Sequence, residues 1–221
     1  MTTACVPPLS TLPAWCDLVT RAGRFTLSPV RPDRDLPLLH RWLNDPVVDE
    51  YWRLGGEPAR VAEYLGEVRA RSHSRGFVGR LSGRAIGYWE VYRAAEDRLG
   101  RYYLARPSDL GVRLLIGEAD CRGIGLGPVL LDALVRALQQ ESRCRVVAAP
   151  DERDSASLRA FAHAGFRRAG TLALPERNAA LMMREAAVPG PMVPRPLVSE
   201  TTTGIPLGPR QPTIGLMTHV R

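Results

Sequence analysis

The spacing of apolar residues divides the first half of the chain into predicted strands and helices. Leu36, Leu39 and Leu43 recur at three- and four-residue steps, which predicts a helix from about Asp33 to Asn44 with Asp33 as a favourable N-cap. The preceding run, Phe25 to Val30, is predicted as a strand. The same reading predicts a helix over 58–71 and two strands, 76–81 and 85–92, on either side of a Ser-Gly turn at 82–83.

The second half of the chain continues with apolar runs that are separated by glycine, proline and charged residues. A strand is predicted at Val112 to Ile116, and a helix is predicted to begin near Leu126, because apolar residues recur there at helical spacing through Leu138. A short strand at 145–149 ends at Pro150-Asp151. A further helix is predicted over 154–164, ended by Gly165, and Phe166 begins another strand.

Between the strand at Val112 to Ile116 and the next helix, the chain reads CRGIGLG. Arg122, Gly125 and Gly127 fit an R-x-x-G-x-G pattern, with Gly123 as an additional glycine. The first amides of a helix lack intrahelical partners, and glycines let several of them converge on one anion without Cβ atoms in the way. The loop is neither a Walker A sequence nor a G-x-G-x-x-G fingerprint. On the glycines alone, phosphate binding and a ligand-free tight turn remain equally good interpretations.

Composition limits the class of protein. The chain has 221 residues, of which 45% are hydrophobic, so it can bury one sizeable core. Cys5, Cys16, Cys121 and Cys144 show no metal-ligand or disulfide spacing, so no metal is expected. No signal segment begins the chain, and no apolar stretch approaches the roughly 20 residues of a membrane helix. These features predict a reduced, cytoplasmic protein that does not bind a membrane.

Charge is a weaker guide to partners. The net charge is +7 with a pI near 9.8, yet every basic residue is arginine and no basic run of five appears. Scattered arginines do not form the patch that nucleic-acid binding requires. We therefore expect no nucleic-acid partner.

The two ends of the chain differ in composition from its middle. Residues 1–22 form a proline-containing lead, and residues 188–221 are rich in proline, threonine and glycine, with no periodic apolar face. Such a segment lacks the means to bury itself, so it is expected to be disordered or draped on the surface. The expected domain spans residues 23–187.

The order strand, glycine loop, helix, strand, helix resembles the GCN5-related N-acetyltransferases (GNAT). The resembling residues are RGIGLG at 122–127, APDERD at 149–154 and HAGF at 163–166. The resemblance implies a single α/β domain whose mixed central sheet, of about six to seven strands, is flanked by helices and has a splayed strand pair at the acyl-CoA site. It also implies a glycine loop on the coenzyme A pyrophosphate and a preceding strand along the pantetheine arm. The implied coenzyme A contacts are Leu115, Ile116, Gly117, Arg122, Gly123, Ile124, Gly125, Leu126, Gly127, Asp154 and Phe161.

From about Gly87 to Glu185 the chain is also similar to the hydroxylysine N-acyltransferases of hydroxamate siderophore assembly, of the mycobactin and aerobactin type. The segments are GYWEVYRAAEDRLGRYY, DLGVRLLIG, ESRCRVVAAPDERD and ERNAALMM, with RWLNDPVVDEYW upstream. This similarity implies transfer of an acyl group from acetyl-CoA or another acyl-CoA to a small amine or hydroxylamine. The oligomeric state stays open.

Two other functions remain open. WLN…VVDEYW and GYWEVY also resemble the aminoglycoside 6'-N-acetyltransferases, whose polycationic substrates need acidic pocket residues. Arg113 argues against that acceptor, and the third alternative is a non-catalytic acyl-CoA-binding module. The acidic residues available for an aminoglycoside are Asp45, Asp49, Glu50 and Glu90.

The usual catalytic positions of the mycobactin-type relatives are altered. Arg113 and Ala149 stand where those enzymes have a histidine and an acidic residue, and Phe161 stands where many GNAT proteins have a tyrosine acid. One interpretation is that an N-hydroxylated acceptor, whose nitrogen is largely neutral, needs no strong base; backbone amides near Leu115 to Gly117 would then polarise the thioester carbonyl. Another is that Glu90 or Asp109 acts as a base through a water.

Four further side chains have both a functional and a structural interpretation. Arg113 is hypothesised to contact a substrate carboxylate, or else it is a solvated or ion-paired strand residue. Tyr92 shares a strand face with Glu90, and that face lines a pocket or meets solvent. Trp52 is a substrate contact or a core residue, and Asp151 is a substrate contact or a turn residue.

Overall fold

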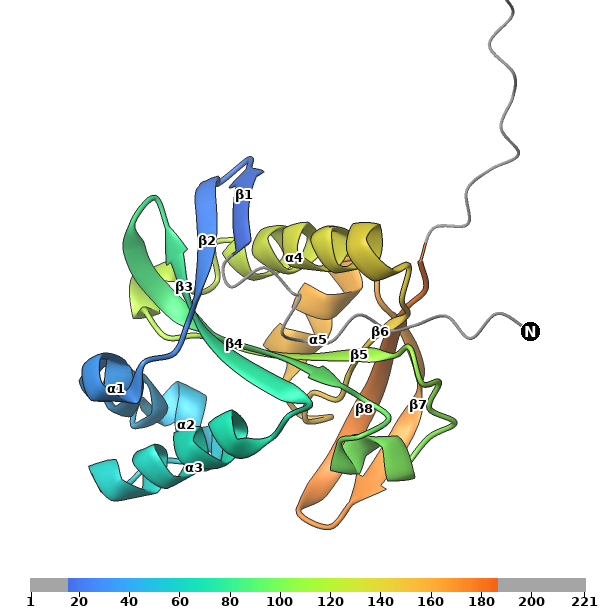
Figure 1. Cartoon of the computed structure of the whole chain (residues 1–221), viewed down its shortest axis with the longest axis horizontal. Helices are drawn as coiled ribbons and strands as arrows, with labels where there is room; N and C mark the ends of the chain where they lie inside the picture. The colour runs from blue at the N-terminus through green and yellow to red at the C-terminus, as the bar shows by residue number, and fades with distance from the viewer. Residues whose placement is uncertain (1–15, 187–221) are drawn as a thin grey trace, which may run out of the picture. The chain divides into compact units, whose positions relative to one another are not determined.

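The computed structural model describes residues 16–186, which form one mixed β-sheet with helices on both faces (Figure 1). Within these residues the sheet has eight strands in the order β1-β2-β3-β4-β5-β6-β8-β7. All neighbours are antiparallel except β5 and β6. The strands are β1 (Cys16–Thr20), β2 (Gly23–Pro29), β3 (Ser74–Leu81), β4 (Arg84–Arg93), β5 (Leu110–Ile116), β6 (Val146–Ala148), β7 (Arg167–Leu174) and β8 (Arg177–Arg184).

The helices lie in two groups, α1 to α3 against one face of the sheet and α4 with α5 against the other (Figure 1). Alternation along β4 places Trp89 in the core beneath α4 and α5, and Tyr88 in the core beneath α1 to α3. The helices are α1 (Pro32–Leu43), α2 (Pro46–Trp52), α3 (Pro58–Ala70), α4 (Leu126–Ser142) and α5 (Ser155–His163). Two 3₁₀ turns, η1 (Arg98–Arg101) and η2 (Ala119–Cys121), complete the regular structure of these residues.

The first three helices each have a proline in the first turn, where a missing N–H costs no hydrogen bond. This corrects the predicted N-cap of α1. The cap is Arg31 rather than Asp33, and the Asp35 carboxylate accepts the Arg31 amide at 2.8 Å. In α2, the Asp45 side chain accepts the Val47 amide at 2.9 Å. Trp52 ends this short helix, which the sequence did not predict.

The sequence did not predict β1 and β8. For this reason the sheet has eight strands, whereas about six to seven were expected. β1 lies inside the predicted lead, residues 1–22, so the domain boundary at residue 23 is wrong by at least the length of this strand. β1 and β2 pair through a tight turn at residues 21–22, which Gly23 closes with a φ of +125°. β8 pairs with both β6 and β7. The predicted tail at 188–221 lies outside the described residues.

The parallel pair β5 and β6 is splayed, as predicted. The two strands pair only at Leu110 with Val146 and at Gly111 with Val147, although β5 continues to Ile116. From Val112 onward β5 is bonded on one side alone, to β4. The fold therefore leaves an open backbone edge in the middle of its sheet. None of the helices between residues 16 and 186 is both long enough and apolar enough to cross a membrane.

Candidate active site

The open edge of β5 offers backbone groups to a ligand. The Gly117 amide donates to the Ile86 carbonyl at 2.8 Å, so the alternation of an antiparallel ladder also turns the Leu115 amide toward β4. The amides of Leu114 and Ile116 then face the gap between β5 and β6. Of the predicted amides near Leu115 to Gly117, those of Leu115 and Gly117 are already used within the sheet, which leaves those of Leu114 and Ile116 for a thioester.

The glycine loop has the backbone geometry of an anion cradle. Gly123 and Gly125 have φ of +72° and +82°, and Gly125 is the N-cap of α4. No atom lies within 4 Å of the place where a Cβ would stand at either glycine. The first amides of a 17-residue helix thus point into open space, which suits a pyrophosphate. Gly127 has a different neighbour, because a Cβ there would lie 3.7 Å from the Ala160 Cβ on α5.

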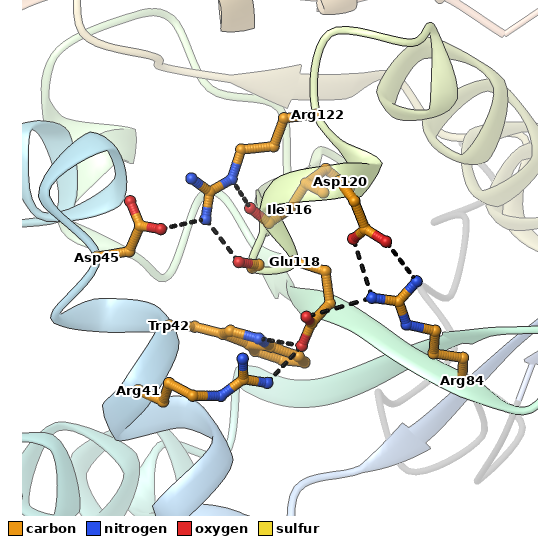
Figure 2. A network of polar contacts seen from close by, with 9 residues as sticks. Arg41, Trp42, Asp45, Arg84, Ile116, Glu118, Asp120 and Arg122 are labelled. Atoms are coloured by element: carbon orange, nitrogen blue, oxygen red, sulfur yellow. Dashed lines mark hydrogen bonds and ion pairs between the residues drawn. The ribbon is translucent and has the colours of Figure 1, made fainter.

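Arg122 does not point its side chain at this open space. Its Nε donates to the Ile116 carbonyl at 2.8 Å, and its Nη2 donates to the Gly117 carbonyl at 2.5 Å and to the Asp45 carboxylate at 3.0 Å (Figure 2). Any contact of Arg122 with coenzyme A would therefore come from its backbone, and its place among the predicted contacts stays a prediction. Its guanidinium stabilises the turn between β5 and α4 through two carbonyl contacts, and links this turn to Asp45 at the start of α2.

A second set of contacts holds the same turn against α1. The Glu118 carboxylate accepts the Trp42 indole N–H at 2.9 Å and an Arg41 N–H at 2.5 Å, and Arg84 bridges to Asp120 at 2.7 Å (Figure 2). A Cβ on Gly117 would lie 2.1 Å from the Trp42 ring. The lack of a side chain at Gly117 thus allows Trp42 to pack closely against the turn.

A cavity of about 540 Å³ opens beside the free edge of β5. Val112 and Leu114 of β5 line it, together with side chains from α2, α3, α5 and the β7–β8 turn. Neither Glu90 nor Asp109 is among the lining residues. Six of the residues that the sequence singled out do line it, namely Trp52, Tyr92, Arg113, Asp151, Asp154 and Phe161.

The floor of the cavity is a buried ionic network. Arg113 donates to Glu90 at 2.8 Å and to Asp97 at 3.0 Å, and its guanidinium lies 4.1 Å from the centre of the Tyr92 ring. Glu90 is fully buried, and its other oxygen accepts the hydroxyls of Tyr64 and of Tyr88. We name this set (Tyr64, Tyr88, Glu90, Tyr92, Asp97 and Arg113) the cavity-floor network.

The polar groups of this network are hydrogen-bonded to one another, with one guanidinium placed between two carboxylates. Burial, followed by the nearby charge of Glu90, raises the pKa of Tyr64 and Tyr88 well above the ordinary value, so both are neutral hydrogen-bond donors. Burial also raises the pKa of Tyr92 to about 12. Both oxygens of Glu90 are occupied, so Glu90 is not a free base. Arg113 has an internal partner, which was the structural alternative for it.

Asp109 lies outside the cavity, which corrects its assignment as a possible base. It is fully buried at the start of β5, where it accepts Arg145 Nε at 2.9 Å, the Tyr103 hydroxyl at 2.9 Å and the Arg106 amide at 2.9 Å. The carboxylate thus ties the segment between η1 and β5 to the start of β6. Its role is structural.

The carboxylates that line the cavity are also engaged. Asp154 caps α5 by accepting the Ser157 amide at 2.9 Å. Asp151 accepts the Arg153 side chain at 3.0 Å, and these hydrogen bonds hold the pKa of Asp151 below its ordinary value. Asp151 thus keeps the turn role that was its structural alternative, and Asp154 has a capping role that was not predicted. The other lining carboxylates pair with arginines: Glu67 with Arg71, Glu96 with Arg93, and Asp97 with Arg113.

Sequence reasoning missed several polar lining residues, among them Tyr64, His73, Asp97 and Arg177. Tyr64 comes from α3, and Asp97 caps η1 in a connecting segment. Arg177 begins β8, inside the segment ERNAALMM that carried the resemblance. No local pattern marked these positions, because the fold gathers them from separate elements.

An open strand edge, a glycine-opened helix N-terminus and an adjoining cavity define a class of protein: an α/β domain that holds an extended, phosphate-bearing co-substrate beside an acceptor pocket. The family model described as "Acetyltransferase (GNAT) domain" matches residues 31–174, and the chain belongs to this family. The predicted family, its enzyme class, its fold and its acyl-CoA co-substrate are thereby confirmed.

Relatives with both predicted acceptor types resemble the chain. The lysine N-acyltransferase MbtK of Mycobacterium sp. (strain MCS) is 31% identical over 72% of this chain, which spans 66% of that protein. The N-hydroxyputrescine acetyltransferase of Acinetobacter baumannii is 29% identical over 77% of this chain and 82% of its own length. The aminoglycoside acetyltransferase AAC(6')-Ib, solved with coenzyme A and kanamycin, has a TM-score of 0.65 at 29% identity, covering 73% of this chain and 94% of its own.

Proposed function

We propose that this protein is an acyl-CoA-dependent N-acyltransferase that acts on a small amine or hydroxylamine, in the assembly of a hydroxamate siderophore. The observation that carries the proposal is the unpaired edge of β5, which runs from the glycine loop into the cavity. We also propose a cytoplasmic location, which agrees with the free, buried thiols of Cys121 and Cys144.

The residues present fit an acyl-CoA. Gly123 and Gly125 leave room for a pyrophosphate at the start of α4, and the open edge of β5 suits the amide groups of a pantetheine arm. When bound, the co-substrate supplies an acyl group that is activated as a thioester. The amides of Leu114 and Ile116 can donate to negative charge that develops on its carbonyl oxygen, at no cost of reorganisation.

The chemistry of the cavity favours an acceptor that arrives neutral. Every lining carboxylate already accepts a hydrogen bond from the chain, and the Glu90 oxygens beneath the floor are occupied. A protonated amine would need such a group to remove its proton. A hydroxylamine nitrogen is largely neutral at physiological pH and needs no such base. Holding this nitrogen beside the thioester carbonyl would then be the main source of rate acceleration.

An aminoglycoside acceptor is less well supported. Asp45 pairs with Arg122, Asp49 accepts the Gly55 amide at 2.6 Å, and Glu90 is sealed beneath the floor. Neither these nor Glu50 line the cavity, and the carboxylates that do line it already accept hydrogen bonds within the chain. Among the described residues, no lining carboxylate is therefore left free for a polycation.

The test is a mass-spectrometric screen for acylated product. The acceptors are N6-hydroxylysine, N5-hydroxyornithine, lysine and kanamycin, each with acetyl-, succinyl- and malonyl-CoA. The proposal predicts product with a hydroxylamine acceptor and a kcat/KM that changes little above pH 7. For lysine, whose amine has a pKa of about 10.4, kcat/KM should rise toward high pH. Product with kanamycin alone would favour the aminoglycoside function, and binding of coenzyme A without any product would indicate a non-catalytic module.

A further inference from the structure

The four arginines that line the cavity differ in how their charge is met. Arg71 pairs with Glu67 at 2.8 Å, Arg98 pairs with Glu176 at 2.5 Å, and Arg113 pairs with Glu90 at 2.8 Å. Arg177 has no carboxylate within ion-pair distance among residues 16–186. Among the described residues, Arg177 is therefore the cavity arginine that forms no direct ion pair.

The surroundings of Arg177 make this lack of a partner costly. Its Nη2 donates to the Ala149 carbonyl at 3.0 Å, while its Nε is buried with no hydrogen-bond partner. A buried donor without a partner destabilises the protein unless a ligand satisfies it. Burial lowers the pKa of Arg177, the charge of Asp151 raises it, and the charges of Arg98 and Arg113 lower it again. The unpartnered Nε and the absence of a direct ion pair within residues 16–186 leave this guanidinium able to bind an anion.

We propose that Arg177 binds a carboxylate of the substrate and so makes the enzyme selective for a carboxylated partner. The guanidinium has the planar fork that matches a carboxylate, and the contact with Ala149 fixes it at the end of β6, beside the mouth of the splay. Arg113, to which the sequence pointed for this role, is held by Glu90 and Asp97 instead. The inference rests on the proposed function, because it places an acceptor or an acyl group in this cavity.

Two sources can supply the carboxylate: the amino-acid acceptor, or the distal end of a dicarboxylic acyl group. Isothermal titration separates them without turnover. One arm compares succinyl-CoA with butyryl-CoA, which has a methyl group in place of the carboxylate. The other compares N6-hydroxylysine with its methyl ester, each with saturating coenzyme A. Because both arms measure binding, failure of acyl transfer in the mass-spectrometric screen is read independently.

The wild-type protein should bind the carboxylated member of one pair more tightly. Arg177→Gln should weaken that member roughly 10- to 100-fold, as expected for a charge-assisted contact, and change the neutral member less than about twofold. Arg177→Lys keeps the charge without the fork and should lose part of the preference, which also serves if Arg177→Gln does not fold. Arg101→Gln, at an exposed arginine outside the cavity, is the matched control and should bind all four probes like the wild type.

The pair that responds identifies the source, the acyl donor or the acceptor, and either response supports the proposal. Equal affinity of the wild type for both members of each pair would overturn it. Equal weakening of both members by Arg177→Gln would also overturn it, since Arg177 would then only support the wall of the cavity.

Discussion

The glycine loop and the cavity floor are neighbours along β5 but are built in opposite ways. At the loop, ligand groups would meet backbone amides, and side chains such as Arg122 face inward to hold the turn. At the floor, side chains from α3, β4, β5 and the segment before η1 form hydrogen bonds with one another. One region depends on the absence of side chains at Gly123 and Gly125, and the other on a specific set of them.

The difference suggests how proteins of one fold can bind the same co-substrate and different acceptors. A backbone cradle needs only glycines and a helix N-terminus, so substitutions of the surrounding side chains leave it intact. The pairing of charged side chains at the cavity floor determines which charged groups remain unpaired and can contact a substrate. In this chain the described residue left over is Arg177.

The largest expected effect comes from breaking the cavity-floor network. Arg113→Met should lower the free energy of unfolding by about 3 kcal/mol, because it leaves the buried carboxylates of Glu90 and Asp97 without their counter-charge. Adding Glu90→Gln should recover part of the loss. Urea denaturation measures both variants. A loss below about 1 kcal/mol for Arg113→Met would mean that the network is not a structural unit.

Asp109→Asn tests whether that carboxylate is structural or catalytic. Removing its charge leaves Arg145 without its partner, so we expect a loss of about 2 kcal/mol in unfolding free energy. Activity measured well below the melting temperature should stay within about twofold. A stable variant whose kcat falls a hundredfold would restore Asp109 as the base.

Gly125→Val probes the cradle. A branched side chain is strained at a φ of +82° and would enter the space in front of the α4 amides. Coenzyme A affinity should fall at least tenfold, about 1.4 kcal/mol. Gly66→Ala is the control, since this exposed glycine of α3 has open space around it, and alanine there should be neutral or slightly stabilising. Unchanged affinity in a folded Gly125→Val protein would argue against the phosphate site.

The smallest effect concerns the anchor of the turn. The hydrogen bond from Arg122 lowers the pKa of Asp45, so the stabilisation is present above the unfolded value of about 3.9 and is lost as the pH falls through the lower folded value. The difference in stability between the wild type and Asp45→Asn should be below about 1 kcal/mol, constant from pH 5 to 8, and should shrink below about pH 4. A difference that grows on acidification would contradict this ion pair.

The loop could be predicted from the sequence because its function is local. Gly123, Gly125 and the helix that follows are adjacent in the chain, and a glycine pattern reports backbone geometry directly. The splay between β5 and β6 was also predicted, but from the family resemblance and not from a local pattern. The floor could not be predicted, since Arg113 meets Glu90 across two strands and meets Asp97 from a connecting segment.

Sequence position alone gave no sign of which partner Arg113 would take, or that Asp109 would be used by Arg145. Long polar side chains can reach several carboxylates, and only the packed fold selects among them. β1 and α2 were missed for a related reason. Both are short elements, and tertiary pairing rather than local pattern stabilises them.

Residue-resolved amide hydrogen exchange, with and without coenzyme A, tests most directly whether the co-substrate occupies the open edge of β5 and the cradle. Coenzyme A should slow exchange at Leu114, at Ile116 and in the first turn of α4, while the Leu115 amide, bonded to β4, should be protected in both states. Binding that leaves exchange at Leu114, Ile116 and the start of α4 unchanged would contradict the account and place the co-substrate elsewhere on the protein.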